Sequence, residues 1–252
     1  MRNKLGKQTL RFSQPISISG RGNVAGNKEG LGPLASCFDH LDDDDMFGSE
    51  SWEKAETTMQ KQALSKALER AGITLNHLDF IFAGDLLNQC IGSSFAVRDQ
   101  DTAFFGLYGA CSTMGEGMIL SGMTLDGGFA THVATVASSH FCTAERQYRT
   151  PLEYGGQRTP TAQWTVTASG AVTLTVQKKA PYLTHATVGK IVDQGITDTN
   201  NMGAAMAPVD VILGKYSTHI KVQTQKIPSM ARIGGILDFV RNVLFIHLSI
   251  GF

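Results

Sequence analysis

The residues with the clearest chemical potential in this chain surround one cysteine at a tight turn. The segment 109–116 (GACSTMGE) follows an apolar run, residues 103–108, and precedes a helical pattern from Met114 to Leu125. This order predicts a strand, a turn and a helix, with Cys111 at the head of the helix. Unpaired backbone N–H groups and the positive end of the helix dipole favour a thiolate there and attract anions. Cys111 is therefore the first candidate for contact with a ligand.

Two more polar side chains follow predicted strands. Asp85 ends the apolar run 78–85, and His140 comes soon after the run 131–137. Helical patterns separate these runs, so βαβ units and a parallel sheet covered on both faces are expected. Ligands of such sheets bind at the carboxyl ends of the strands. We therefore expect Asp85, Cys111 and His140 to converge in space.

The flanking segments predict further elements. The first 48 residues combine short β-like pieces with glycine-rich loops, among them residues 20–22, and end in the acidic run 42–45. That run is interpreted as a solvated loop, with a hard-cation site as the alternative. Ser51 and Gly72 bound a predicted helix. Residues 166–174 predict a hairpin that turns near Gly170, and residues 182–192 predict another strand.

The composition narrows the classes of protein. The chain has 252 residues, 42% hydrophobic and 17% charged, which is typical of a globular protein of one large or two small domains. A formal net charge of zero gives no reason to expect a nucleic-acid partner. The four cysteines form no C-x-x-C pair, so we expect free thiols, a reducing compartment and no structural metal. No apolar run approaches the ~20 residues of a membrane span, and no signal peptide is predicted.

An ordered series of motifs adds a family resemblance. The motifs are 83–89 (AGDLLNQ), 109–113 (GACST), 138–140 (SSH), 143–149 (TAERQYR), 153–157 (EYGGQ) and 202–208 (MGAAMAP). Together they resemble the stage V sporulation protein AD family of endospore-forming bacteria, over roughly Lys4 to Leu213. The resemblance implies an α/β, thiolase-like fold of two similar halves, each a sheet flanked by helices. It also implies a non-enzymatic, dipicolinic acid-binding subunit of the assembly that moves this compound across the spore inner membrane in sporulation and germination.

The resemblance stops near residue 213. We expect residues 1–213 to form a thiolase-like domain, the N-terminal half plus the start of the second, with the rest of the second half truncated. Residues 214–252 then form a divergent basic tail, interpreted as an out-of-frame peptide or an interfacial helix.

The resemblance and the residue chemistry together give a ligand-binding set and no catalytic set. The expected ligand-binding residues are Cys111, His140, Arg146, Arg149 and Asp85. The two arginines match the carboxylates of dipicolinate or form local ion pairs. His140 donates to a carboxylate or ends a strand. Asp85 would repel a bare dianion and suits a calcium–dipicolinate chelate, or it caps the following helix.

The alternatives to this function are an acyltransferase of the thiolase or ketoacyl-synthase type that uses Cys111, and a non-functional truncated fragment. The histidines beyond residue 208, His219 and His247, lie in neither a His-Gly-Gly nor a Gly-His-Pro context, so no catalytic residue is expected. No cofactor is expected. The partners implied are dipicolinic acid, the other subunits of the stage V sporulation A assembly and a peripheral contact with the spore inner membrane; a homodimer through the N-terminal half is also allowed.

Overall fold

A computed structural model describes residues 3–86, 88–145, 165–179, 181–189 and 247–251. The strands are β1 (Lys4–Leu5), β2 (Thr9–Ala25), β3 (His40–Leu41), β4 (Phe80–Asp85), β5 (Ala103–Gly106), β6 (His132–Ser139), β7 (Ala168–Val176), β8 (Tyr182–Thr187) and β9 (His247–Gly251). The helices are α1 (Asn27–Gly30), α2 (Trp52–Ala71), α3 (Ile91–Val97), α4 (Thr113–Asp126) and α5 (Phe141–Glu145), with short 3-10 turns η1 (Ala35–Cys37), η2 (Leu75–His77) and η3 (Ala110–Ser112).

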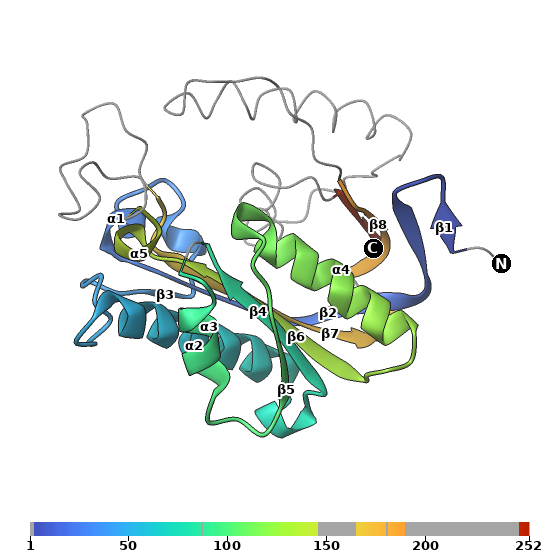
Figure 1. Cartoon of the computed structure of the whole chain (residues 1–252), viewed down its shortest axis with the longest axis horizontal. Helices are drawn as coiled ribbons and strands as arrows, with labels where there is room; N and C mark the ends of the chain where they lie inside the picture. The colour runs from blue at the N-terminus through green and yellow to red at the C-terminus, as the bar shows by residue number, and fades with distance from the viewer. Residues whose placement is uncertain (1–2, 87, 146–164, 180, 190–246, 252) are drawn as a thin grey trace, which may run out of the picture.

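The strands join in one mixed sheet with the order β5-β4-β6-β7-β2-β8-β9, and β1 and β3 pair with β2. β4 lies between β5 and β6 and is parallel to both, whereas β7 runs antiparallel to β6 and to β2. Helices α2 and α3 cover one face of the sheet and α4 covers the other (Figure 1). The α/β fold with a mixed sheet flanked by helices is therefore confirmed, and β4, β5 and β6 end at the same edge.

Side-chain alternation along β4 supplies both apolar layers. Ile81 belongs to the core under α2, together with Met59, while Phe82 belongs to the core under α4, together with Met118. Successive strand residues point to opposite faces, so a strand that is buried on both faces needs apolar residues throughout. The predicted helix from Ser51 to Gly72 is confirmed as α2.

Glycines explain why β2 is longer than predicted. Residues 20–22 were expected to form a loop, but they lie within β2, and this prediction was wrong. Any side chain at Gly20 or Gly22 would collide with the backbone of α2 at Ala67 or Ala63. These glycines therefore serve close helix–strand packing rather than a turn.

The predicted turn near Gly170 is also wrong. Gly170 was expected near the turn of a hairpin, yet Ala168–Val176 is one continuous strand in which Gly170 pairs with both Asn23 and Ala137. The predicted strand over 182–192 is confirmed for its first part, as β8.

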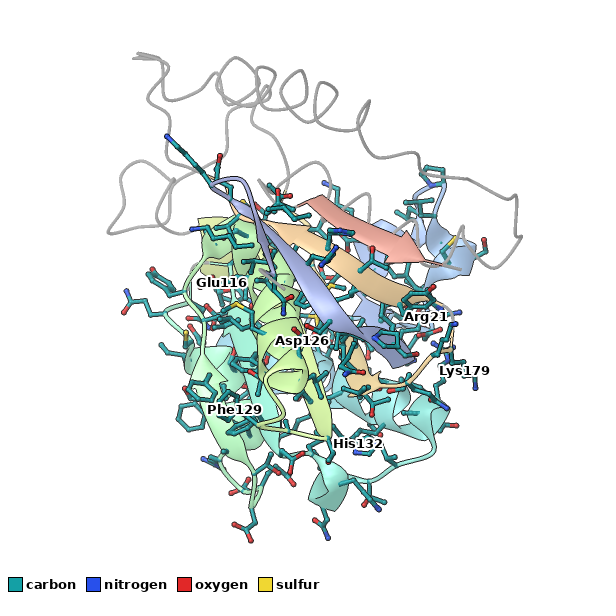
Figure 2. The ribbon with its side chains drawn as sticks, turned by 90° about the vertical axis from the view of Figure 1, so that its right-hand side faces the viewer. Arg21, Glu116, Asp126, Phe129, His132 and Lys179 are labelled. Atoms are coloured by element: carbon teal, nitrogen blue, oxygen red, sulfur yellow. The ribbon has the colours of Figure 1, made fainter. Side chains whose placement is uncertain are left out.

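α4 is fastened to the sheet at its far end. Asp126 accepts hydrogen bonds from the backbone N–H groups of Ser13 (2.6 Å) and Gln14 (2.8 Å), which lie in β2. Figure 2 shows this face, with Glu116 near the carboxyl ends of the parallel strands and His132 at the opposite end of the molecule. The beginning of α4 therefore lies on the side where the candidate residues gather.

The predicted domain boundary at 213 and most of the tail, 214–246, lie outside the described residues; residues 247–251 form β9, antiparallel to β8. In the part of the chain that is described, no helix is both long and apolar enough to cross a membrane.

Candidate functional site

The turn that carries Cys111 joins β5 to α4 through the 3-10 turn η3. The hydroxyl of Ser112 donates to the carbonyl of Gly109 (2.6 Å), and the hydroxyl of Thr113 donates to the carbonyl of Ala110 (2.8 Å). Ala110 has a φ of 47°, a left-handed conformation that L-residues other than glycine adopt at a cost of about 1 kcal/mol. The turn is therefore held tightly, and it fixes the position of the Cys111 side chain.

The charge state of Cys111 differs from the prediction. The residue is exposed, yet the atoms that crowd the thiol desolvate it and raise its pKa above the ordinary value. Cys111 lies in η3, outside α4, and Ser112 turns its hydroxyl back to Gly109 instead of capping the helix. Glu116 lies in the first turn of α4 and reaches Gly109, so the head of this helix already has a carboxylate. The surroundings of Cys111 therefore disfavour the thiolate that the sequence predicts, because they raise the pKa of the thiol instead of lowering it.

The carboxyl end of β4 lies directly under the turn. The backbone N–H of Leu107 donates to the carbonyl of Ala83 (2.8 Å), and any side chain at Gly84 would collide with the carbonyl of Leu107. The same carbonyl accepts the thiol hydrogen of Cys90 (3.1 Å), which precedes α3. The sheet thus brings the β4–α3 and β5–α4 connections together, as the strand pattern predicted.

Asp85 lies at this junction and is fully buried. Its Oδ1 accepts the backbone N–H of Cys90 (3.2 Å), and the backbone N–H groups of Asn88 and Gly92 also bond to the carboxylate. These bonds support the helix-capping interpretation of Asp85, since they satisfy amides at the beginning of α3. None of the described residues donates a hydrogen bond to Oδ2, and burial raises the pKa of the carboxyl.

His140 follows β6 and is also fully buried. Its Nδ1 accepts the backbone N–H of Cys142 (3.1 Å), so Nε2 carries the proton and donates to the carbonyl of Asp45 (2.8 Å). Desolvation lowers the pKa of the imidazole. Both ring nitrogens are thus bonded inside the protein, and His140 holds the 42–48 loop against the end of β6. The expected contact of His140 with a ligand stays a prediction.

The acidic run 42–45 is built into that loop. The backbone N–H of Asp44 donates to the carboxylate of Asp42 (3.0 Å), and the backbone N–H of Met46 donates to that of Asp44 (3.0 Å). These local turns match the solvated-loop interpretation. No cluster of three or more His, Cys, Asp or Glu side chains in the described ranges is placed to hold a metal ion.

Behind this edge lies a buried polar network that the sequence reasoning did not find. Its centre is Glu56 on α2, which is 1% exposed. Glu56 Oε1 accepts the hydroxyl of Ser138 (2.8 Å), and Oε2 accepts the amide of Asn88 (3.1 Å) and the hydroxyl of Thr143 (3.0 Å). Burial and the nearby charge of Asp85 raise the pKa of Glu56 to about 7. One carboxyl group therefore ties α2 to the β4–α3 connection, to β6 and to α5.

Gln60, one helical turn further along α2, extends the network. Its amide nitrogen lies within hydrogen-bond reach of the hydroxyls of Ser138 (2.7 Å) and Ser93 (3.0 Å) and of the carbonyl of Gly84 (3.4 Å). Its Oε1 has no hydrogen-bond partner among the residues that the structure describes. A sequence signal for both residues exists. Glu56 and Gln60 each follow a residue of the apolar stripe of α2, Ala55 and Met59, so both lie on its buried face.

The other expected ligand-binding residues, Arg146 and Arg149, lie outside the described residues. Cys37, Cys90 and Cys111 are free thiols, as predicted.

Comparison with known proteins identifies relatives. Residues 6–229 match the profile of the family described as stage V sporulation protein AD. The chain is 44% identical over 203 residues to stage V sporulation protein AD of Bacillus subtilis (strain 168), covering 81% of this chain and 60% of that relative. The chain thus spans less than two thirds of the relative's length.

Solved structures show the same fold at low identity. A variant of OleA from Xanthomonas campestris bound with cerulenin matches with a TM-score of 0.55 and 15% identity, over 84% of this chain and 71% of that one. The 3-oxoacyl-(acyl carrier protein) synthase III, FabH, of Xanthomonas oryzae matches with a TM-score of 0.52 and 16% identity, over 82% and 72%. These similarities confirm the thiolase-like fold.

Proposed function

This chain belongs to the stage V sporulation protein AD family, and from that premise we propose that it binds dipicolinic acid, free or as a calcium chelate, without transforming it chemically. The site is the edge where β4, β5 and β6 end, with Cys111 at its exposed side. Its role is that of a binding subunit of the spore inner-membrane transport apparatus, for uptake in sporulation and release in germination.

One observation carries the non-enzymatic part of this proposal. Cys111 occupies the exposed turn where a thiolase-like enzyme would keep a nucleophile, but its pKa is raised rather than lowered. A catalytic thiol needs a depressed pKa or an adjacent base. His140 does not serve as that base in the arrangement described, because its Nε2 proton is committed to the carbonyl of Asp45.

The neutral thiol still suits a binding role. A compact, polarizable side chain on a rigid turn presents a fixed surface to a flat aromatic ligand. Arg146 and Arg149 remain the proposed partners of the two carboxylates, since a guanidinium group binds a carboxylate through two parallel hydrogen bonds. The other subunits of the stage V sporulation A assembly are the proposed route to the membrane, where the chain would sit peripherally.

Calorimetric titration of the 252-residue chain with dipicolinate, with and without calcium, tests the proposal. We expect binding that weakens as salt rises, because charge attraction is screened beyond about 10 Å at 0.1 M salt. Cys111→Ala should bind more weakly and Cys111→Trp should not bind, while both keep the parent's unfolding transition. A folded chain that gives no heat with either form of the ligand overturns dipicolinate binding.

The acyltransferase alternative has its own readout. Incubation with acetyl-CoA or acetoacetyl-CoA should leave no thioester on Cys111 and release no free coenzyme A above the rate of Cys111→Ala. A measured turnover that disappears in Cys111→Ala would replace the binding function with acyl transfer. Failure of both assays with a folded chain would favour the non-functional fragment.

A further inference from the structure

We propose that Glu56 and Asp85 form a buried acid pair that takes up a proton when the neighbouring site binds a dianion. This inference rests on the proposed function and adds to it a proton that accompanies the ligand. Glu56 comes from α2 and Asp85 from the end of β4, and both are at most 1% exposed. In the parallel pairing of β4 with β6, Asp85 lies opposite Ser138, whose hydroxyl donates to Glu56.

The hydrogen bonds of the network accommodate both charge states of Glu56. When the carboxyl is ionised, it accepts from Ser138, Asn88 and Thr143. The hydroxyl of Thr143 also lies 3.1 Å from the carbonyl of His140, so it has a second acceptor when Oε2 carries a proton. Within the described part of the chain, no group donates to the buried Oδ2 of Asp85, which leaves the pair one donor hydrogen short when both carboxyls are ionised.

The charges around Glu56 favour retention of a proton. Among the described residues, Asp85 acts on Glu56 with a charge of the same sign, and two like charges in a buried site oppose joint ionisation. The elements packed against α2 differ in the ionisable residues that they contain. β7 and α3 contain no ionisable residue, and β6 contains only His132, at its far end. β2 contains Arg11, near its beginning, and Arg21, which acts on Asp39. Among the described residues, other ionisable groups near this end are Cys90, whose thiol pKa is raised, His140, whose imidazole pKa is lowered, and Asp45 and Glu53, which act on His140.

The connection to the ligand site runs through the backbone. Cys90 bonds to Asp85 through its N–H and to the carbonyl of Leu107 through its thiol, and Leu107 leads into the Cys111 turn. A dianion at this edge adds negative charge near the pair. Binding of the dianion therefore raises the affinity of the pair for a proton. This proton leaves the buffer acid and bonds to a carboxylate oxygen of the pair. No covalent bond of the ligand changes.

The expected stoichiometry follows from the titration. A group half protonated at pH 7 whose affinity for protons rises tenfold gains roughly 0.4 proton at that pH. Dipicolinate itself takes up none, since aromatic carboxylic acids are ionised at pH 7. Proton uptake at pH 7 therefore reports on the protein.

The test is calorimetric titration of the full chain with sodium dipicolinate at pH 7 in buffers of different ionisation enthalpy, such as phosphate and Tris. The slope of the observed enthalpy against the buffer enthalpy gives the number of protons taken up. We expect roughly 0.4 for the parent chain, less than 0.1 for Glu56→Gln, and the parental value for Glu69→Gln. Glu69 lies on the exposed face of the same helix and is the matched control.

A second variant keeps the proposal testable if Glu56→Gln does not fold. Thr143→Val removes one donor to Glu56 Oε2, so the uptake should persist and its maximum should move to higher pH. Binding without proton uptake between pH 6 and 8, or uptake that survives in Glu56→Gln, overturns this inference alone. A folded chain without binding heat overturns the proposed function, and this inference with it.

Discussion

The pH dependence of folding offers a ligand-free test of the buried carboxyl. Replacing Glu56 with Gln removes a group whose pKa lies at about 7 in the folded chain, against 4.5 as the ordinary value. Between these two pH values the folded chain holds the proton more tightly than the unfolded chain does. The stability that Glu56 contributes is therefore fully present below about pH 4.5 and is lost as the pH rises through about 7.

The magnitude follows from the same numbers. The pKa of Glu56 rises from 4.5 in the unfolded chain to about 7 in the folded chain. At 1.36 kcal/mol per pH unit, this difference changes the free energy of unfolding by about 3 kcal/mol. Glu56 is 1% exposed, so screening by solvent does not reduce this figure appreciably. The free energy of unfolding of the parent should fall by that amount relative to Glu56→Gln between pH 4.5 and pH 8. In thermal melts this corresponds to a relative shift of roughly 6–12 °C.

Urea denaturation of the parent, Glu56→Gln and Glu69→Gln at several pH values measures the difference directly. The contributions of groups that titrate alike in the three proteins cancel when their free energies of unfolding are compared. Asp85 remains buried in all three, and burial is the main cause of its raised pKa. The reasoning is refuted if the free-energy difference between the parent and Glu56→Gln stays within about 0.5 kcal/mol from pH 4.5 to pH 8. Glu69→Gln should show no such trend, because Glu69 is exposed and paired with Lys66.

Three other substitutions or reactions test separate features. Iodoacetamide at pH 7 should alkylate Cys111 more slowly than free cysteine, since the thiol pKa is raised; a faster reaction, followed by mass spectrometry, would restore the thiolate. Gly22→Ala should lower the free energy of unfolding by about 1–3 kcal/mol, because its methyl group would collide with α2 at Ala63; an unchanged urea midpoint would contradict that packing. Asp39→Asn should destabilise the chain at pH 7 and progressively less as the pH falls below about 4, because Arg70 lowers the pKa of Asp39 and the parent loses this contribution on protonation; a pH-independent difference would argue against the pairing.

The sequence predicted the parts of the fold that have a strong local signal. The sequence of α2 has an N-terminal capping serine, an apolar stripe at helical spacing and a terminal glycine. The apolar runs before Asp85 and His140 were correctly predicted as parallel strands. The errors concern glycines whose role depends on distant contacts. Gly20 and Gly22 resemble loop residues until α2 lies against them, and Gly170 resembles a turn until β6 and β2 flank it.

The sequence predicted which strand ends meet, but it did not predict the hydrogen bonds and burial of the candidate residues there. The strand order was enough to bring Asp85, Cys111 and His140 to one edge. The protonation of these side chains depends on burial and on hydrogen bonds, which the spacing of residues does not reveal. Desolvation raises the pKa of Cys111, and burial raises the pKa of Asp85. Both ring nitrogens of His140 form hydrogen bonds inside the protein. Glu56 was missed because a lone glutamate on an amphipathic helix usually faces solvent.

Backbone strain points independently to the same edge. The described residues other than glycine with positive φ are Phe47, Gln89, Cys90 and Ala110. Gln89 and Cys90 lie in the β4–α3 connection, Ala110 lies in the Cys111 turn, and Phe47 lies in the loop that His140 holds through Asp45. Such conformations cost about 1–3 kcal/mol each and persist only where surrounding bonds enforce them. Strain that gathers at connections from separate parts of the sequence is hard to attribute to the needs of folding alone. It supports the proposed binding site as one whose shape is fixed before the ligand arrives, and the Glu56 network holds one of these connections, between β4 and α3, through Asn88.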